Sequence, residues 1–130
     1  LYDAYGALRK ICILGATGGG RDTWKRPVMG RLAGERCDTV ILTNEDPYDE
    51  DPRQIVEDLA RACGKKPEII MDRRSAIRRA LELAQAGDAV LVTGKGTDPN
   101  ICGPGGERAP WSDAAVAREE LAALLKKRAV

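Results

Sequence analysis

The sequence predicts an α/β domain built on a mostly parallel sheet with helices on both faces. Four short runs are almost wholly apolar, as expected of strands buried on both sides; they lie at about residues 10–16, 39–43, 68–71 and 89–93. The stretches between them carry apolar residues at helical spacing. Strands that alternate with amphipathic helices are typical of parallel sheets. A chain of 130 residues is long enough for one such domain with its own core.

Four helices are expected between and after these strands, at about residues 27–35, 52–63, 72–85 and 112–128. Pro27 suits a first helical turn, and the first helix should turn Val28, Met29, Leu32 and Ala33 inward. Acidic or hydroxyl residues stand where the later helices need an N-cap. Two stretches are expected to be irregular or only partly helical: residues 1–10 as the end of a helix or a lead-in, and residues 94–112 as a long loop rich in glycine and proline.

Composition argues against several classes of protein. The formal net charge is +1, so the chain lacks the basic surface expected of a nucleic-acid-binding protein. It has no histidine and no C-x-x-C pair, so no metal site is expected. No apolar run is long enough to span a membrane, and no signal peptide is recognisable. The chain begins without methionine, and we expect a piece of a larger cytoplasmic protein whose cysteines are mostly buried, reduced thiols: Cys12, Cys37, Cys63 and Cys102.

Three polar loops are expected to share one edge of the sheet, because parallel α/β sheets bind ligands beyond the carboxyl ends of their strands. They are the glycine-rich loop 15–26, the acidic loop 44–51 and the loop 94–112, which begins G-K-G-T-D. Cations and acids at close quarters suit a zwitterion such as an amino acid, whose carboxylate an arginine can hold through two parallel hydrogen bonds. The alternative is that these charges are solvated surface groups and that the glycines only turn the chain.

Three motifs in these loops resemble the C-terminal domain of the Mur ligases, in the branch that adds the third residue of the peptidoglycan stem peptide to UDP-N-acetylmuramoyl-dipeptide. GATGGGRDTWKRPVMG is similar to the family's G-x-R-D-x-x-K-R-P-x-M-G stretch. LTNEDPYDEDPRQIVEDL is similar to its T-x-D-N-P-R-x-E-x-P-x-x-I segment, and GDAVLVTGKGTD to its G-D-x-V-L-V-A-G-K-G-H-E segment. The motifs occur in the family's order, and the resemblance covers about residues 10–125.

The resemblance implies a Rossmann-like, three-layer domain of a three-domain, ATP-dependent amide-bond ligase. In that chemistry the stem carboxylate becomes an acyl phosphate, which the amine of the incoming amino acid attacks. ATP and Mg²⁺ would bind mainly to a central domain, and UDP to an N-terminal domain, both outside residues 1–130. The chain alone is therefore expected to be inactive, with no catalytic residue, metal or cofactor of its own. Its partners would be the incoming amino acid, UDP-N-acetylmuramoyl-dipeptide and the two other domains.

The same resemblance implies a set of substrate-binding residues. Arg21 matches the arginine that grips the carboxylate of the incoming amino acid, Gly94 matches a backbone contact, and Asp98 matches the acid that follows G-K-G-x. Candidates for phosphate or interdomain contacts are Lys25, Arg26 and Lys95.

Two positions depart from the family pattern and bear on which amino acid is added. Asp46 stands where the family has asparagine, and Tyr48 stands where ligases for meso-diaminopimelate have an arginine that holds the second carboxylate. We therefore expect a lysine-like or other basic amino acid, with Asp46 facing its side-chain ammonium. Two other readings stay open: a related domain from folylpolyglutamate or cyanophycin synthetase, and a non-catalytic Rossmann-like module that binds a small anion or a partner protein.

Overall fold

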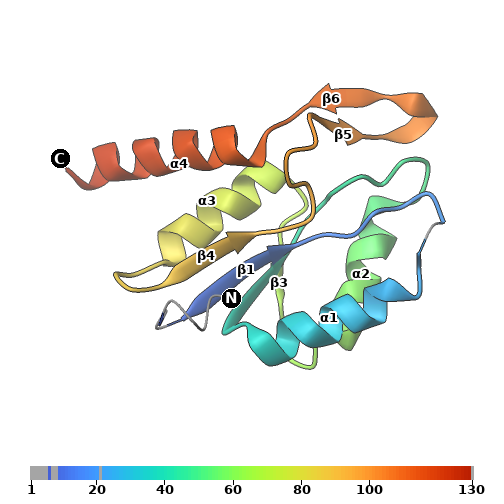
Figure 1. The fold of residues 1–130 in the computed structure, drawn as a ribbon, viewed down its shortest axis with the longest axis horizontal. Coiled ribbons are helices and arrows are strands. Elements are labelled where there is room, and N and C mark those ends of the chain that lie inside the picture. The colour runs from blue at the N-terminus through green and yellow to red at the C-terminus, as the bar shows by residue number, and fades with distance from the viewer. Residues whose placement is uncertain (1–5, 7–8, 21, 130) are drawn as a thin grey trace.

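The sheet of this protein is parallel, as its sequence predicts (Figure 1). The computed structural model describes residues 6, 9–20 and 22–129, so most of the predicted lead-in lies outside the described residues. Four strands run in the order β3-β2-β1-β4, and every neighbouring pair is parallel. They are β1 (Lys10–Leu14), β2 (Thr39–Leu42), β3 (Glu68–Ile69) and β4 (Ala89–Val92). The helices are α1 (Lys25–Arg36), α2 (Pro52–Ala62), α3 (Arg73–Leu83) and α4 (Asp113–Arg128).

Helices cover both faces of this sheet, with α3 and α4 on one side and α1 and α2 on the other (Figure 1). Successive side chains of a strand point to opposite faces, which divides the core in two. The α3–α4 side holds Ile11, Ile13, Ile41, Ala76, Ile77, Ala80 and Val116. The α2 side includes Val40, Leu42, Ile55, Val56 and Leu59. The predicted three-layer α/β fold is therefore confirmed.

α1 differs from its prediction in both its start and its buried face. It begins at Lys25, two residues before the expected Pro27. Met29 and Ala33 do pack against the core, but Val28 and Leu32 are exposed, so the predicted inward face is wrong for those two residues. The residues that α1 buries most fully are Arg26, Gly30 and Gly34.

The reason is the closeness of α1 to α2. A Cβ atom added to Gly34 would overlap the carbonyl group of Cys63, and one added to Gly30 would overlap that of Leu59. The two helices thus touch backbone to backbone through glycines four residues apart, on one face of α1. Apolar side chains at helical spacing do not reveal a face made of glycine, so the predicted face includes the exposed Val28 and Leu32 beside the packed Met29 and Ala33.

The starts of the other helices agree with prediction. The side chains of Asp51, Asp72 and Ser112 each accept a hydrogen bond from a backbone N–H group in the first turn of α2, α3 and α4. Such caps satisfy donors that have no partner within the helix. They also fix where each helix leaves the loops at the carboxyl edge of the sheet.

The predicted loop over residues 94–112 contains a β-hairpin, so this expectation is wrong in part. β5 (Asn100–Cys102) pairs with β6 (Arg108–Pro110) in antiparallel fashion across a short 3₁₀ turn at Pro104–Gly106. Gly105 and Gly106 have φ values of +65° and +78°, a conformation that favours glycine. Strands of three residues are too short to leave an alternating pattern, and the turn residues dominate the sequence.

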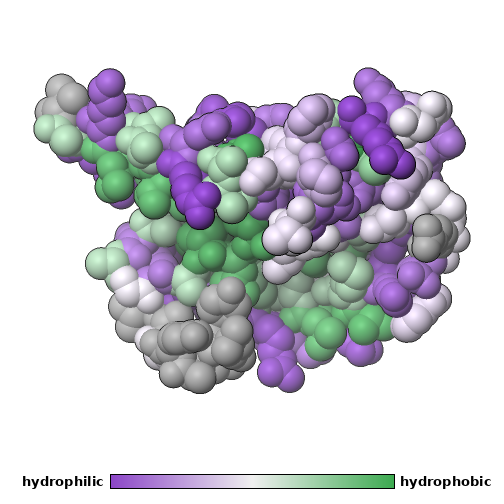
Figure 2. Space-filling view, turned by 45° about the horizontal axis from the view of Figure 1, so that its top comes forward, coloured by the Kyte–Doolittle hydropathy of each residue, from purple (hydrophilic) through white to green (hydrophobic). Residues whose placement is uncertain are grey.

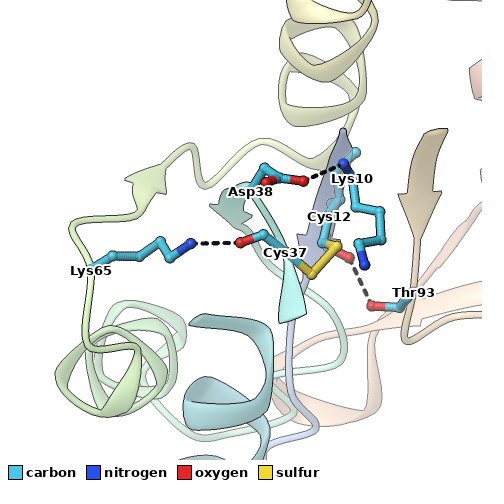
Figure 3. Close-up of a disulfide and its surroundings, with 7 residues drawn as sticks. Lys10, Cys12, Cys37, Asp38, Lys65 and Thr93 are labelled. Carbon is cyan, nitrogen blue, oxygen red and sulfur yellow. Dashed lines mark hydrogen bonds between the residues drawn. A yellow bond between two sulfur atoms is a disulfide. The ribbon is translucent and has the colours of Figure 1, made fainter. Parts of the chain in front are cut away.

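Cys12 and Cys37 form a disulfide, which corrects the expectation of reduced thiols at these positions (Figure 3). The bond joins the middle of β1 to the residue that follows α1, across a sequence separation of 25. Free thiols remain at Cys63, which is buried, and at Cys102, which is partly buried. The pairing depends on the path of α1, which brings the chain back beside β1, and cysteine spacing alone does not reveal it.

Candidate functional site

Three loops meet beyond the carboxyl ends of β1, β2 and β4. The loop after β1 is bonded to the loop after β2, because Gly18 N donates to Asp46 O at 2.7 Å and Thr17 Oγ1 donates to the Glu45 carboxylate at 2.9 Å. The loop after β4 reaches the same place. Gly94 has a φ of +106°, and a Cβ atom there would lie 2.5 Å from Glu45 Oε2. The predicted meeting of three polar loops at one edge is confirmed.

Lys95 holds two of these loops together. Its side chain is 0% exposed, and its Nζ atom donates to both carboxylate oxygens of Asp46 at 2.8 Å and to Asp98 at 3.1 Å. Burial alone would lower the pKa of Lys95, but the hydrogen bonds and charges of Asp46 and Asp98 outweigh it and raise that pKa. Asp46 is 8% exposed and Asp98 is 47% exposed, so only Asp98 presents a carboxylate to solvent.

The β5–β6 hairpin is fastened to the loop after β2. Cys102 N donates to Asp46 Oδ1 at 2.8 Å, and Tyr48 N donates to Cys102 O at 3.1 Å. Near the tip of the hairpin, Gly105 N donates to Asp49 Oδ1 at 2.7 Å. Together with the bonds from Lys95, these contacts use both oxygens of Asp46 inside the domain. Asp46 and Tyr48 thus lie beside a hairpin that the sequence did not reveal.

Arg26 is paired within the domain as well. It is buried, and its guanidinium binds Glu50 through hydrogen bonds of 2.7 and 2.9 Å and Asp58 through one of 3.1 Å. Glu50 Oε1 also accepts from Gly20 N at 3.1 Å, so this ion pair fixes the glycine-rich loop. Lys25 stays near the surface beside Asp22, with the charged atoms 3.1 Å apart.

Arg73 forms a third ion pair with a buried cation, which sequence reasoning missed. Its guanidinium holds both oxygens of Asp113 at 2.8 and 2.9 Å and donates to the carbonyl oxygens of Asn44 and Thr93. Burial raises the pKa of Asp113, but the hydrogen bonds from Arg73 and Trp111 outweigh it and hold that pKa below its usual value. These contacts tie the starts of α3 and α4 to the site loops. No spacing rule links partners 40 residues apart.

Glu45 forms one wall of a pocket between the first loop and α1. The pocket has a volume of about 200 Å³ and is lined by Ala16, Thr17, Asp22, Lys25, Arg26, Met29, Glu45 and Gly94. Glu45 is 7% exposed, and burial raises its pKa against the lowering effects of the Thr17 hydrogen bond and the charge of Arg73. A carboxyl group perturbed in this way at a pocket wall is typical of a ligand site.

A larger hollow of about 490 Å³ lies between α3 and α4, and Figure 2 shows hydrophobic residues beneath the projecting end of α4. Its lining residues are Arg78, Glu82, Glu120, Ala123, Leu124, Lys127 and Arg128. They belong to the later turns of both helices, whereas the site loops adjoin the first turns. The hollow is therefore separate from the three loops.

Among the residues that the structure describes, several groups that could bind nucleotide phosphates are already engaged within this domain. Gly18 N and Gly20 N point to acceptors of this domain, and Arg26 and Lys95 are already paired with carboxylates. Among the described residues, no group of three or more His, Cys, Asp or Glu side chains is arranged to hold a metal ion. The residues described here therefore do not fit ATP or Mg²⁺. Within the same residues, no helix combines the length and apolar character needed to cross a membrane.

Arg21, the residue predicted to grip the substrate carboxylate, lies outside the described residues. The remaining predicted residues fall into two groups. Asp46, Tyr48, Gly94, Lys95 and Asp98 adjoin one another around the loops after β2 and β4. Lys25 and Arg26 lie on the first turn of α1 and line the pocket.

Comparison with known proteins places these loops in a family. The sequence profile of the family described as Mur ligase, glutamate ligase domain matches residues 1–96. The UDP-N-acetylmuramoyl-L-alanyl-D-glutamate--2,6-diaminopimelate ligase of Aquifex aeolicus is 42% identical over 113 residues, covering 85% of this chain and 23% of that protein. The ligase of the same name from Chlorobium phaeobacteroides is 44% identical over 117 residues, covering 89% and 22%.

A solved structure of a UDP-N-acetylmuramoyl-L-alanyl-D-glutamate--2,6-diaminopimelate ligase has the same fold, with a TM-score of 0.82 and 34% sequence identity. The match covers 92% of this chain and 25% of that one. The chain thus spans about a quarter of the length of the proteins it matches. With a family profile that matches most of its length and relatives above 40% identity, the chain belongs to the family described as Mur ligase, glutamate ligase domain.

Proposed function

We propose that this chain is the C-terminal domain of a longer ligase that adds the third residue to UDP-N-acetylmuramoyl-dipeptide. The observation that carries the proposal is the meeting of three loops, each with a motif of that family, around the Lys95–Asp46 ion pair and the Glu45 pocket. The relatives named above favour this reading over a folylpolyglutamate or cyanophycin synthetase domain. A cytoplasmic location, expected from the resemblance, is part of the same proposal.

In this proposal the domain binds and orients the incoming amino acid, and the rest of the ligase supplies ATP chemistry. The Glu45 pocket has a volume that suits an amino acid better than a nucleotide. Asp98 offers a half-exposed carboxylate for an ammonium group, and Arg21 is assigned the α-carboxylate. ATP and Mg²⁺, which the described residues do not fit, would bind to other domains of the longer ligase, as would the UDP portion of the other substrate.

The favoured amino acid is 2,6-diaminopimelate, the one in the names of the relatives. The sequence predicts a lysine-like substrate instead. That prediction depends on a free negative charge at Asp46. Lys95 and Cys102 occupy both oxygens of Asp46, so that charge is already balanced within the domain. The electrostatic reason for preferring a purely basic side chain is thereby weakened.

The test uses the complete protein that contains this chain. It is incubated with UDP-N-acetylmuramoyl-dipeptide, ATP, Mg²⁺ and either diaminopimelate or lysine. Phosphate release is followed over time, and the tripeptide product is identified by mass spectrometry. Tripeptide formation supports the proposal. Its absence with every amino acid, or glutamate addition to a folate instead, contradicts it.

The role of the domain is tested with Asp98→Asn in the same protein. The KM for the amino acid should rise about 10-fold or more, because a charge-assisted hydrogen bond to the substrate ammonium is lost, while the KM for the dipeptide stays unchanged. Glu35→Gln, which alters an exposed carboxylate at the far end of α1, serves as the control.

A further inference from the structure

The β5–β6 hairpin places Arg108 beside the candidate site. Arg108 lies directly opposite Cys102 in the antiparallel pair. The N–H and C=O groups of Cys102 both point to the other side, where they bond Asp46 and Tyr48. Cys102 and Arg108 therefore form a non-hydrogen-bonded pair, in which the two side chains share one face and lie close together. A single strand separates the backbone of Arg108 from the loop after β2.

The guanidinium of Arg108 is exposed, and within the described part of the chain it has no hydrogen bond or ion pair. Its charge nevertheless reaches the site. The pKa of Asp98 is lowered mainly by the hydrogen bond from Lys95 and also by the positive charge of Arg108. Asp98 Oδ1 also accepts from Asn100 N at 3.4 Å, so this half-exposed carboxylate lies at the start of β5, the strand that pairs with the strand carrying Arg108.

The other described cations near the candidate site are already paired with carboxylates of this domain. Lys95 forms ion pairs with Asp46 and Asp98. Arg26 is paired with Glu50, and Lys25 with Asp22. The acidic loop 44–51 contains no cation. Among the described residues around the candidate site, Arg108 is the guanidinium left available for a ligand.

A cation and an anion on the same hairpin fit a group that carries a carboxylate and an ammonium on one carbon. Both ends of 2,6-diaminopimelate are such groups, whereas the side chain of lysine ends in an ammonium alone. We propose that Arg108 is a specificity-determining residue that binds the distal carboxylate of the incoming amino acid, while Asp98 binds the distal ammonium. This inference rests on the function proposed above. The hairpin then selects diaminopimelate over lysine.

The experiment compares steady-state kinetics of the complete ligase with diaminopimelate and with lysine. Arg108→Gln should raise the KM for diaminopimelate about 10- to 100-fold, the range expected for loss of a charge-assisted contact. The KM for lysine and the kcat with either substrate should change less than 2-fold. Arg108→Lys, which keeps the charge without the bidentate geometry, should lose less than Arg108→Gln. Arg118→Gln, on the exposed side of α4, is the matched control and should behave as wild type.

Outcomes separate this inference from the function on which it rests. A wild-type enzyme that makes tripeptide, with a KM for diaminopimelate unchanged in Arg108→Gln, overturns the inference and leaves the proposed function standing. Equal losses with both amino acids, or a wild-type preference for lysine, overturn it as well. A wild-type protein that forms no tripeptide with any amino acid overturns both.

Discussion

The Lys95–Asp46 ion pair should dominate the stability of the site, and Lys95→Met tests this. Methionine resembles lysine in length and volume, so packing is nearly conserved. The change leaves the carboxylate of Asp46, 8% exposed, with Cys102 N as its remaining donor among the described residues. Removing one partner of a buried pair costs about 3–5 kcal/mol. The contact to Asp98 adds little, because that carboxylate is 47% exposed and screened by solvent.

The assay is urea unfolding of the chain at pH 7, followed by circular dichroism. In a thermal melt, the same loss of unfolding free energy corresponds to a fall in Tm of roughly 10–15 °C for a domain of this size. The double variant Asp46→Asn/Lys95→Met should recover most of it, because no unpaired charge stays buried. Lys66→Met, at an exposed lysine, is the control and should stay within about 0.5 kcal/mol of wild type. A loss below about 1 kcal/mol in Lys95→Met would refute the reasoning.

Three further changes test the fold and the site. Gly34→Ala would normally favour a helix, but here the new methyl group meets the carbonyl of Cys63, so we expect a loss of about 3 kcal/mol or more in urea unfolding. Glu45→Gln should stabilise the protein at pH 7, because the raised pKa of Glu45 means that its charged form opposes folding. Wild type should gain stability as the pH falls from neutral through that raised pKa toward 4.5, and the variant should lack this gain. Cys37→Ser, which opens the disulfide to Cys12, should cost about 3 kcal/mol under oxidising conditions.

Each of these changes has its own control. Gly103→Ala, where φ is −112° and the nearest atom is 3.5 Å away, should be nearly neutral; if Gly34→Ala is equally mild, α1 and α2 are not in backbone contact. A pH profile that is identical for wild type and Glu45→Gln would show that burial does not perturb this carboxyl. For the disulfide, wild type in reducing agent should match Cys37→Ser, and indifference of both to the redox state would contradict the bond.

Patterns that act over short distances were readable from the sequence. The apolar strands, the capped starts of α2, α3 and α4, and the parallel direction of the strands followed from local residue types. The carboxyl-edge rule then placed the three polar loops together. The Thr17–Glu45 and Lys95–Asp46 hydrogen bonds, and the close approach of Gly94 to Glu45, confirm this placement.

What the sequence did not reveal depends on partners far apart in the chain. Arg73 meets Asp113 across 40 residues, and Arg26 meets Glu50 across 24. The sequence showed the charges but not that they neutralise one another inside the fold. The same applies to Lys95, which looked like a cation for an outside phosphate and is instead sealed against Asp46.

In the proposed ligase, three loops at one edge of the sheet bind the incoming amino acid. The most direct measurement is hydrogen exchange of the complete ligase, with and without diaminopimelate, in the presence of UDP-N-acetylmuramoyl-dipeptide and a non-hydrolysable ATP analogue. Adding the amino acid should protect peptides that cover residues 15–26, 44–51 and 93–108. Protection confined to the hollow between α3 and α4, in peptides over residues 78–82 and 120–128, would contradict it.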